Sequence, residues 1–163
     1  AHQWSGILPD VMPLAKGLGS GVPIGAVVAG PKAAHLFQPG NHGTTFGGNP
    51  LSTRAGVETL RIMKEEGLME NAGRVGAYLK SGLEQALAGE PGVIEVRGRG
   101  LMLGIELDRP CGALVGQAAQ AGLLISVTAD RVVRMVPPLI LSEAEAQEII
   151  DILCPLIHAF LKP

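Results

Sequence analysis

The 163-residue sequence has few aromatic residues and no long apolar stretch. It contains three Phe, one Trp and one Tyr, although 47% of its residues are hydrophobic, so its core must be built mainly from aliphatic side chains. No apolar run reaches the ~18 residues that a membrane-spanning helix requires, and no secretory signal is recognisable. We therefore expect a protein that neither spans a membrane nor is exported.

Positive charge is also scarce. The formal net charge is -2 at pH 7, and no stripe of Lys and Arg runs along the chain, which argues against nucleic acid as a partner. The two cysteines, Cys111 and Cys154, lie far apart and fit the reduced thiols of a cytoplasmic protein better than a disulfide. The four histidines lack the spacing of metal ligands, so we predict no metal site.

Predicted helices and strands interleave along the chain, which indicates a mixed α/β fold. Runs of β-branched residues between turn formers predict strands, and apolar residues at helical spacing predict helices. The predicted strands span 22–29 (expected to be buried), 93–97, 101–107, 123–127 and 131–136, and the predicted helices span 31–37, 50–66, 68–87, 110–121 and 142–160. The composition changes near Gly67, which predicts two domains, 1–67 and 68–163.

Lys16 lies in an unusual setting for a lysine. Apolar residues precede it, and Gly17, Gly19 and Gly21 follow it, so a flat ligand could approach the backbone without meeting a Cβ. We expect the apolar surroundings to desolvate the ammonium group and favour the neutral amine, which is the form that attacks a carbonyl. The alternative is an ordinary solvated loop lysine.

A second candidate site is the loop around Thr44 and Thr45. It offers two hydroxyl groups and glycine backbone N–H groups just before a helix that is predicted to start at Asn49 and Pro50. Hydroxyl and N–H donors beside the positive end of a helix can hold a phosphate. The alternative is an ordinary Asn-Pro cap preceded by two incidental threonines.

Arg134 is the third candidate, because it lies in an otherwise apolar predicted strand. A guanidinium in such a strand needs a partner, and a carboxylate that accepts two parallel hydrogen bonds is the best match. The partner could be the carboxylate of a ligand. It could also be a protein acid such as Glu106, in which case Arg134 would have a structural role.

The order of these motifs resembles one enzyme family. Lys16 precedes a glycine-rich stretch, and it is followed by the segments His42–Pro50, Arg97–Gly104 and Arg134–Pro138. This ordered set is similar to the class III pyridoxal-phosphate-dependent aminotransferases, and within them to the acetylornithine aminotransferases of arginine biosynthesis. The resemblance covers essentially the whole chain.

The resemblance implies a role for each candidate residue. Lys16 matches the lysine that holds pyridoxal 5'-phosphate as a Schiff base and moves the proton. Thr45 matches a threonine that binds the cofactor phosphate, typically that of the neighbouring subunit of a homodimer. Thr44 matches a position that touches the substrate, and Arg134 matches an arginine that binds a substrate carboxylate. The implied reaction transfers an amino group from N-acetylornithine to 2-oxoglutarate in the cytoplasm.

The resemblance also implies that the chain is incomplete. Family members are about twice as long or longer, and they carry upstream cofactor-binding elements that this sequence lacks. We therefore expect the C-terminal part of a fold type I transferase, that is, the end of the large cofactor domain plus a small C-terminal α+β domain, and expect this part alone to be inactive. Ornithine, succinylornithine or 4-aminobutyrate aminotransferase, and a non-catalytic folding or dimerisation module, remain alternatives.

Overall fold

A computed structural model describes residues 2–162 of the chain. These residues form two compact units, one ending at Glu66 and one beginning at Gly67. Ala1 and Pro163, the outer ends of the two predicted domains, lie outside the described residues.

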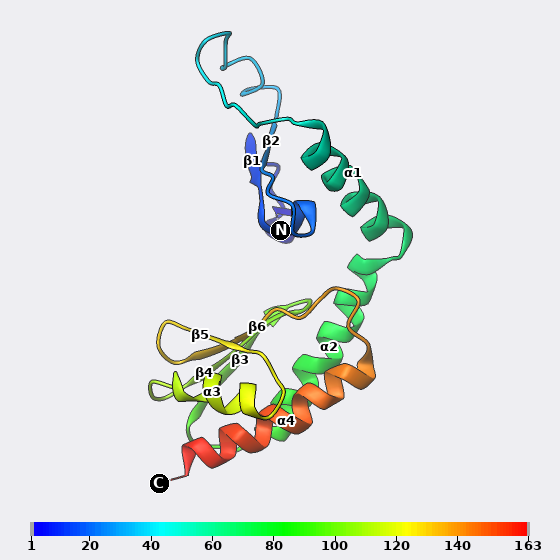
Figure 1. Cartoon of the computed structure of the whole chain (residues 1–163). Helices are drawn as coiled ribbons and strands as arrows, with labels where there is room; N and C mark the ends of the chain where they lie inside the picture. The colour runs from blue at the N-terminus through cyan, green and yellow to red at the C-terminus, as the bar shows by residue number, and fades with distance from the viewer. Residues whose placement is uncertain (1, 163) are drawn as a thin grey trace. The chain divides into compact units, whose positions relative to one another are not determined.

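The first unit contains a β-hairpin, two 3-10 helices and one α-helix (Figure 1). In chain order these are η1 (His2–Ser5), β1 (Val11–Leu14), η2 (Lys16–Gly19), β2 (Ala26–Ala29) and α1 (Pro50–Glu65). Strands β1 and β2 pair antiparallel, with Val11 opposite Ala29 and Leu14 opposite Ala26.

Two predictions for this unit are wrong. The strand predicted over 22–29 is limited to Ala26–Ala29, and all four of its residues are exposed rather than buried. A sheet of two strands cannot bury both of its faces, so an apolar sequence alone does not make a buried strand. The helix predicted over 31–37 is instead a series of turns.

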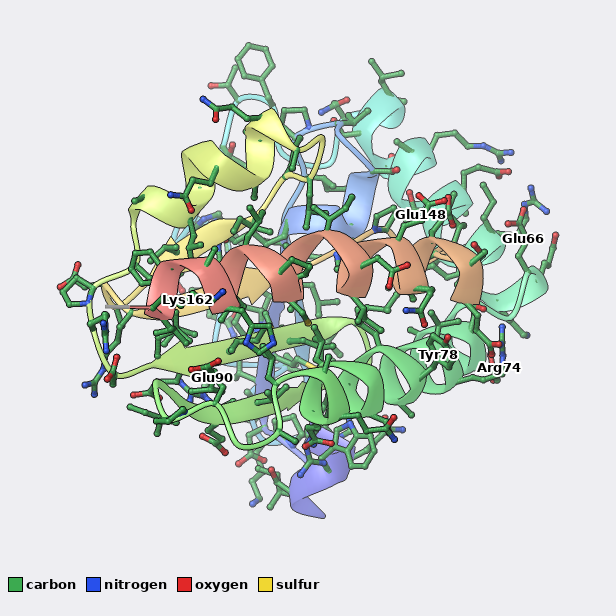
Figure 2. The ribbon with its side chains drawn as sticks, turned by 90° about the horizontal axis from the view of Figure 1, so that it is seen from below. Glu66, Arg74, Tyr78, Glu90, Glu148 and Lys162 are labelled. Atoms are coloured by element: carbon green, nitrogen blue, oxygen red, sulfur yellow. The ribbon has the colours of Figure 1, made fainter. Side chains whose placement is uncertain are left out.

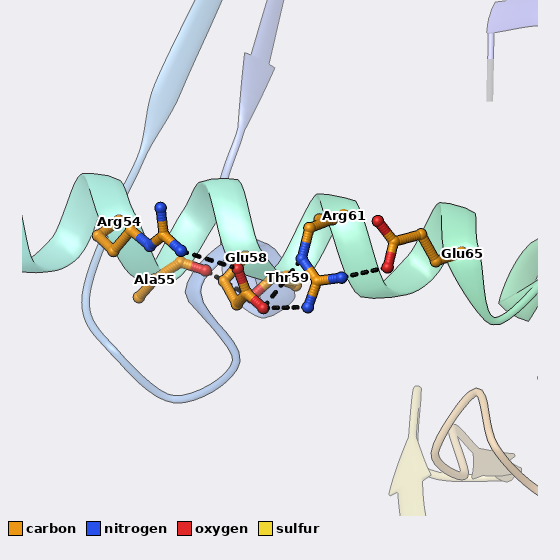
Figure 3. Close-up of polar contacts among 6 residues, drawn as sticks. All are labelled: Arg54, Ala55, Glu58, Thr59, Arg61 and Glu65. Atoms are coloured by element: carbon orange, nitrogen blue, oxygen red, sulfur yellow. Dashed lines mark hydrogen bonds and ion pairs between the residues drawn. The ribbon is translucent and has the colours of Figure 1, made fainter.

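Helix α1 starts where the sequence predicts. The side-chain oxygen of Asn49 accepts a hydrogen bond from the backbone N–H of Ser52 at 3.0 Å, and Pro50 occupies the first helical position. Figure 3 shows the exposed ladder of Arg54, Glu58, Arg61 and Glu65 along this helix. The hydrogen bond from Arg61 is the main cause that lowers the pKa of Glu58, although such exposed pairs add little stability.

The second unit is a four-stranded antiparallel sheet packed against helices (Figure 1). Its elements are α2 (Leu68–Ala86), β3 (Val93–Arg99), β4 (Met102–Leu107), α3 (Ala113–Gln120), β5 (Ser126–Thr128), β6 (Val132–Met135) and α4 (Glu143–Leu161). The strand order is β3-β4-β6-β5. Strands β5 and β6 form an antiparallel hairpin, with Ala129 and Asp130 at positive φ in its turn.

One face of this sheet forms the core with α2 and α4. Alternate residues of the two central strands, β4 and β6, are buried, as in a sheet covered on one side only. The largest fully buried side chains are aliphatic, as the composition predicts: Val75, Leu79, Leu83, Leu103, Ile105, Leu107, Leu114, Val133, Leu153 and Ile157. The free cysteines Cys111 and Cys154 are buried in the same cluster.

Helix α2 lies unusually close to the turn between β3 and β4. A Cβ at Gly76 would lie 2.8 Å from the Cα of Gly100 and closer still to its carbonyl group. Gly76 is therefore required at this contact, because backbone atoms cannot rotate out of the way as a side chain can. The turn itself needs Gly100, whose φ is +52°.

Helix α4 begins at a capping box, at the start that the sequence predicts. Ser142 accepts a hydrogen bond from the backbone N–H of Glu145, whose carboxylate in turn accepts from the backbone N–H of Ser142. The hydroxyl of Tyr78 on α2 donates to Gln147 of α4 at 2.7 Å, and Arg74 pairs with Glu143 at the same end of the two helices (Figure 2). These contacts fix how α4 lies along α2.

Candidate active site

Lys16 is the first residue of η2, and only Ala15 separates it from the end of strand β1. Its φ is +59°, in the left-handed region that residues with a Cβ rarely adopt, and Ser20 at the other end of the turn has a φ of +48°. Each such residue costs of order 1 kcal/mol or more, and such residues are frequent at functional sites. The strained backbone therefore makes the η2 turn a candidate functional site.

The side chain of Lys16 is exposed in the described chain, whereas the sequence predicts apolar surroundings for it. Its apolar neighbours on β1 belong to the two-stranded hairpin and lie at the surface or are only half-buried. They cannot surround the ammonium group. This exposure agrees with the alternative of a solvated loop lysine.

The η2 turn packs against helix α1 at Gly56, and Ile24 lies between Gly19 of the turn and Gly56 of the helix. A Cβ at Gly19 would lie 2.8 Å from the Cγ2 atom of Ile24. A Cβ at Gly56, on α1, would lie 3.4 Å from the Cδ1 atom of the same isoleucine. Gly56 also faces the backbone oxygen of Leu18. Lys16 is thus exposed, but the backbone turn that begins with it is anchored by packing.

Thr44 and Thr45 lie in an exposed loop that precedes α1. The loop turns sharply at Gly47 and Gly48: a Cβ at Gly47 would overlap the side chain of Thr44, and Gly48 has a φ of +72°. In Figure 1 this cyan loop extends away from the blue η2 turn. Within the first unit, the loop that carries Thr45 therefore runs away from the turn that begins with Lys16.

The N-terminus of α1 is already capped. Asn49 accepts the N–H of Ser52 with its side-chain oxygen and donates to the carbonyl of Phe46 at 2.8 Å. The cap that the sequence suggested as an alternative is therefore present. It engages one of the N–H donors that a phosphate would otherwise use, and it leaves the loop before the helix exposed.

Arg134 lies in the middle of β6, and its side chain is on the sheet face opposite the core. Its Nε donates to the Oγ of Ser126 at 3.1 Å. It does not pair with Glu106, which is instead bound by Arg97 at 2.5 Å and Arg131 at 3.1 Å. The structural ion pair with Glu106 that the sequence left open for Arg134 is therefore wrong.

Arg134 belongs to a row of residues that crosses the open face of the sheet. The strand register places Arg97, Gly104, Arg134 and Ser126 side by side on four neighbouring strands. Gly104 lies between Arg97 and Arg134 in this row, and because it has no side chain, nothing projects from the sheet between the two arginines. An open groove of about 510 Å³ runs over this region. Arg134 also borders an apolar cavity of about 580 Å³.

Ser126 is the residue of this site that sequence reasoning missed. Nothing in its local sequence distinguishes it, and only the pairing of β5 with β6 places it beside Arg134. Among residues 2–162, no group of three or more His, Cys, Asp and Glu could hold a metal ion. No helix in the same range is long and apolar enough to cross a membrane.

Comparison with known proteins identifies the class of enzyme to which these residues belong. Residues 1–157 match the family described as Aminotransferase class-III, and the chain belongs to this family. Acetylornithine aminotransferase 1 of Bordetella pertussis is 63% identical over 161 residues, which are 99% of this chain and 41% of that protein. The chain therefore spans about 41% of the length of such curated relatives.

Solved structures agree with the fold. Ornithine δ-aminotransferase of Plasmodium falciparum superimposes with a TM-score of 0.89 at 33% identity, covering 98% of this chain and 42% of that one. N-acetylornithine aminotransferase of Stenotrophomonas maltophilia has a TM-score of 0.83 at 36% identity, covering 99% and 43%. The predicted mixed α/β fold of the pyridoxal-phosphate-dependent aminotransferases is confirmed.

Proposed function

We propose that the chain is the C-terminal portion of a pyridoxal-phosphate-dependent enzyme that transfers the amino group of N-acetylornithine to 2-oxoglutarate in arginine biosynthesis. The observation that carries this proposal is the 63% identity to an acetylornithine aminotransferase over 161 residues. Residues 1–67 would end the large cofactor domain, and 68–163 would form the small domain. The complete enzyme would be a cytoplasmic homodimer, and the chain alone would be inactive.

The names of the curated relatives favour acetylornithine over ornithine as the substrate. Curated acetylornithine aminotransferases are 63% identical in Bordetella pertussis and 48% identical in Nitrosomonas europaea, whereas solved structures of the ornithine and acetylornithine enzymes lie at similar identities, 33% and 36%. Succinylornithine and 4-aminobutyrate remain alternative donors, because donor selection depends largely on upstream residues. A non-catalytic folding or dimerisation module is the alternative of a different class.

The donor set of the described residues fits the cofactor. Lys16 offers a primary amine that can bond to an aldehyde, on a turn whose backbone is fixed by packing. Thr45 offers a hydroxyl, and its loop offers backbone N–H groups, both suited to a phosphate. When bound, pyridoxal phosphate would supply the electron sink that stabilises the carbanion formed at the substrate Cα.

Each residue has its own role in the proposed reaction. Lys16 would hold the cofactor through its Nζ and would carry a proton away from the substrate Cα. Arg134 would hold a substrate carboxylate through its guanidinium, and Thr44 would touch the substrate. Thr45 would bind the phosphate in the partner subunit, which is consistent with a loop that extends away from η2.

The proposal is tested by expressing the chain both alone and extended by the coding sequence upstream of Ala1. We expect the extended protein to convert N-acetylornithine and 2-oxoglutarate to glutamate and to show a cofactor absorbance that Lys16→Ala removes. Lys32→Ala is the matched control, since Lys32 is an exposed lysine of the same unit that pairs only loosely with Asp10, at 3.6 Å.

Two results would contradict the proposal. Equal loss of absorbance in Lys16→Ala and Lys32→Ala would mean that no particular lysine holds the cofactor. Absence of any lysine-dependent absorbance and of amino transfer in the extended protein would favour the non-catalytic module.

A further inference from the structure

We propose that Ser126 is a positioning residue for Arg134: its hydroxyl holds one edge of the guanidinium, so that the other edge is presented to a carboxylate. This inference rests on the proposed role of Arg134 as a carboxylate-binding residue. It adds a residue from a different strand, which neither the sequence motifs nor the comparisons with known proteins assign to the site.

Two hydrogen bonds join the same pair of residues. Strand register places Ser126 directly opposite Arg134 in the antiparallel β5–β6 pair. The Nε of Arg134 donates to the Oγ of Ser126 at 3.1 Å, and the same hydroxyl donates to the backbone carbonyl of Arg134 at 3.3 Å. The hydroxyl is therefore oriented by the strand it faces, and it accepts from the side chain with a lone pair aimed at Nε.

This arrangement determines which donors of Arg134 remain. A guanidinium has five N–H groups, one on Nε and four on the two terminal nitrogens. Within residues 2–162 the bond from Nε is the only side-chain hydrogen bond of Arg134, and it makes no ion pair there. The two terminal nitrogens thus form the free edge, whose geometry matches both oxygens of one carboxylate.

The neighbouring charges support a selective role for Arg134. Glu106 is the acid nearest in register on the same face, and it is engaged by Arg97 and Arg131. Ser126 lies on the opposite side of Arg134 from β4, the strand that carries Glu106. A hydrogen bond from that side holds the guanidinium away from the internal acid. Without it, Arg134 would be free to cross the bare surface at Gly104 and join Glu106.

The test uses the full 163-residue chain with glutarate as the probe, a dicarboxylate that cannot be transaminated. The Nε–H signal of Arg134 is followed by ¹⁵N NMR while glutarate is added. We expect Ser126→Ala to increase the mobility of this group and to weaken glutarate binding three- to tenfold, which is about the effect of losing one ordinary hydrogen bond. Ser126→Thr keeps the hydroxyl and should restore both properties.

Two controls complete the design. Ser81→Ala removes a serine hydroxyl from α2, where it accepts only a 3.4 Å bond from Gln85, and it should leave the Arg134 signal and the affinity unchanged. Arg134→Gln should abolish binding. Thermal unfolding of every variant shows whether the fold is kept, since a merely structural role of Ser126 would change the melting temperature without a specific effect on Arg134.

The outcomes separate the two proposals. If Arg134→Gln abolishes binding and Ser126→Ala does not weaken it, the role of Ser126 is refuted while the role of Arg134 stands. If Arg134→Gln leaves binding unchanged, the carboxylate role of Arg134 falls, and the positioning role of Ser126 falls with it. Failure of Ser126→Thr to restore the wild-type signal would also overturn the inference.

Discussion

Two glycines on helix α2 should respond to the same substitution with opposite signs. Gly73 and Gly76 lie one helical turn apart, but Gly73 has no atom within 4 Å of the position that a Cβ would occupy, whereas a Cβ at Gly76 would overlap the backbone of Gly100. Gly73→Ala should therefore raise the free energy of unfolding by about 0.5–1 kcal/mol, because alanine is the better helix former.

Gly76→Ala gains the same helix propensity but must displace the β3–β4 turn. The new methyl carbon would lie 2.8 Å from the Cα of Gly100, and contacts below 3.0 Å are essentially never seen for real Cβ atoms. Overpacking of this kind typically costs about 1–3 kcal/mol, and more where rigid backbone must move. We expect a net fall of about 2 kcal/mol, which corresponds to a melting temperature lower by roughly 8–16 °C for a unit of this size.

Urea unfolding followed by far-UV circular dichroism measures both variants. The midpoints should move in opposite directions while the slope m stays constant, because the surface exposed on unfolding is the same. If Gly76→Ala were as stable as Gly73→Ala, the close approach of α2 to Gly100 would be wrong. A changed slope in Gly76→Ala alone would instead indicate that the turn separates from the helix.

Three further predictions follow from other contacts. Ser142→Ala should lower the free energy of unfolding by about 1 kcal/mol through loss of the α4 cap. Because hydrogen bonds from Ser142 hold the pKa of Glu145 below its usual value of 4.5, this loss of stability should become smaller as the pH is lowered below 4.5. A loss of stability that does not depend on pH would contradict the capping box. Burial, helped by the charge of Asp151, raises the pKa of Cys154 from 9.0 to about 11. The unfolded thiol then ionises first, so the contribution of Cys154 is complete below pH 9 and is lost between pH 9 and 11. The stability advantage of the wild type over Cys154→Ala, measured in urea, should narrow across that range, and a constant advantage would refute the burial of the thiol. Gly19→Ala should destabilise the first unit by about 1–3 kcal/mol, since the methyl group would lie 2.8 Å from the side chain of Ile24, and an unchanged melting temperature would show that Gly19 does not pack closely against Ile24.

Local signals explain what the sequence predicted correctly. The start of α1 follows from Asn49 and Pro50, and the start of α4 follows from the Ser142 capping box. In both cases the hydrogen-bond partners lie within one helical turn, so the residues that decide the structure are adjacent in the sequence.

Pairing between distant segments explains what the sequence did not predict. Strand β1 includes Pro13, which lacks an N–H and argues against a strand, yet the residues around it pair with β2. The importance of Ser126 depends on its position opposite Arg134, which the chain reaches only after the hairpin turn. The exposure of Lys16 depends on how much structure covers β1, and flanking apolar residues do not reveal that.

The left-handed backbone at Lys16 has a consequence for how this position would change under selection. Glycine or asparagine would adopt a φ of +59° with less strain than lysine, so the backbone alone favours replacing Lys16. A library randomised at position 16 and screened only for folded protein should therefore become enriched in glycine and asparagine. The same library screened for amino transfer in the extended protein should retain lysine. The difference between the residues enriched in the two screens would show how strongly activity depends on the amine of Lys16.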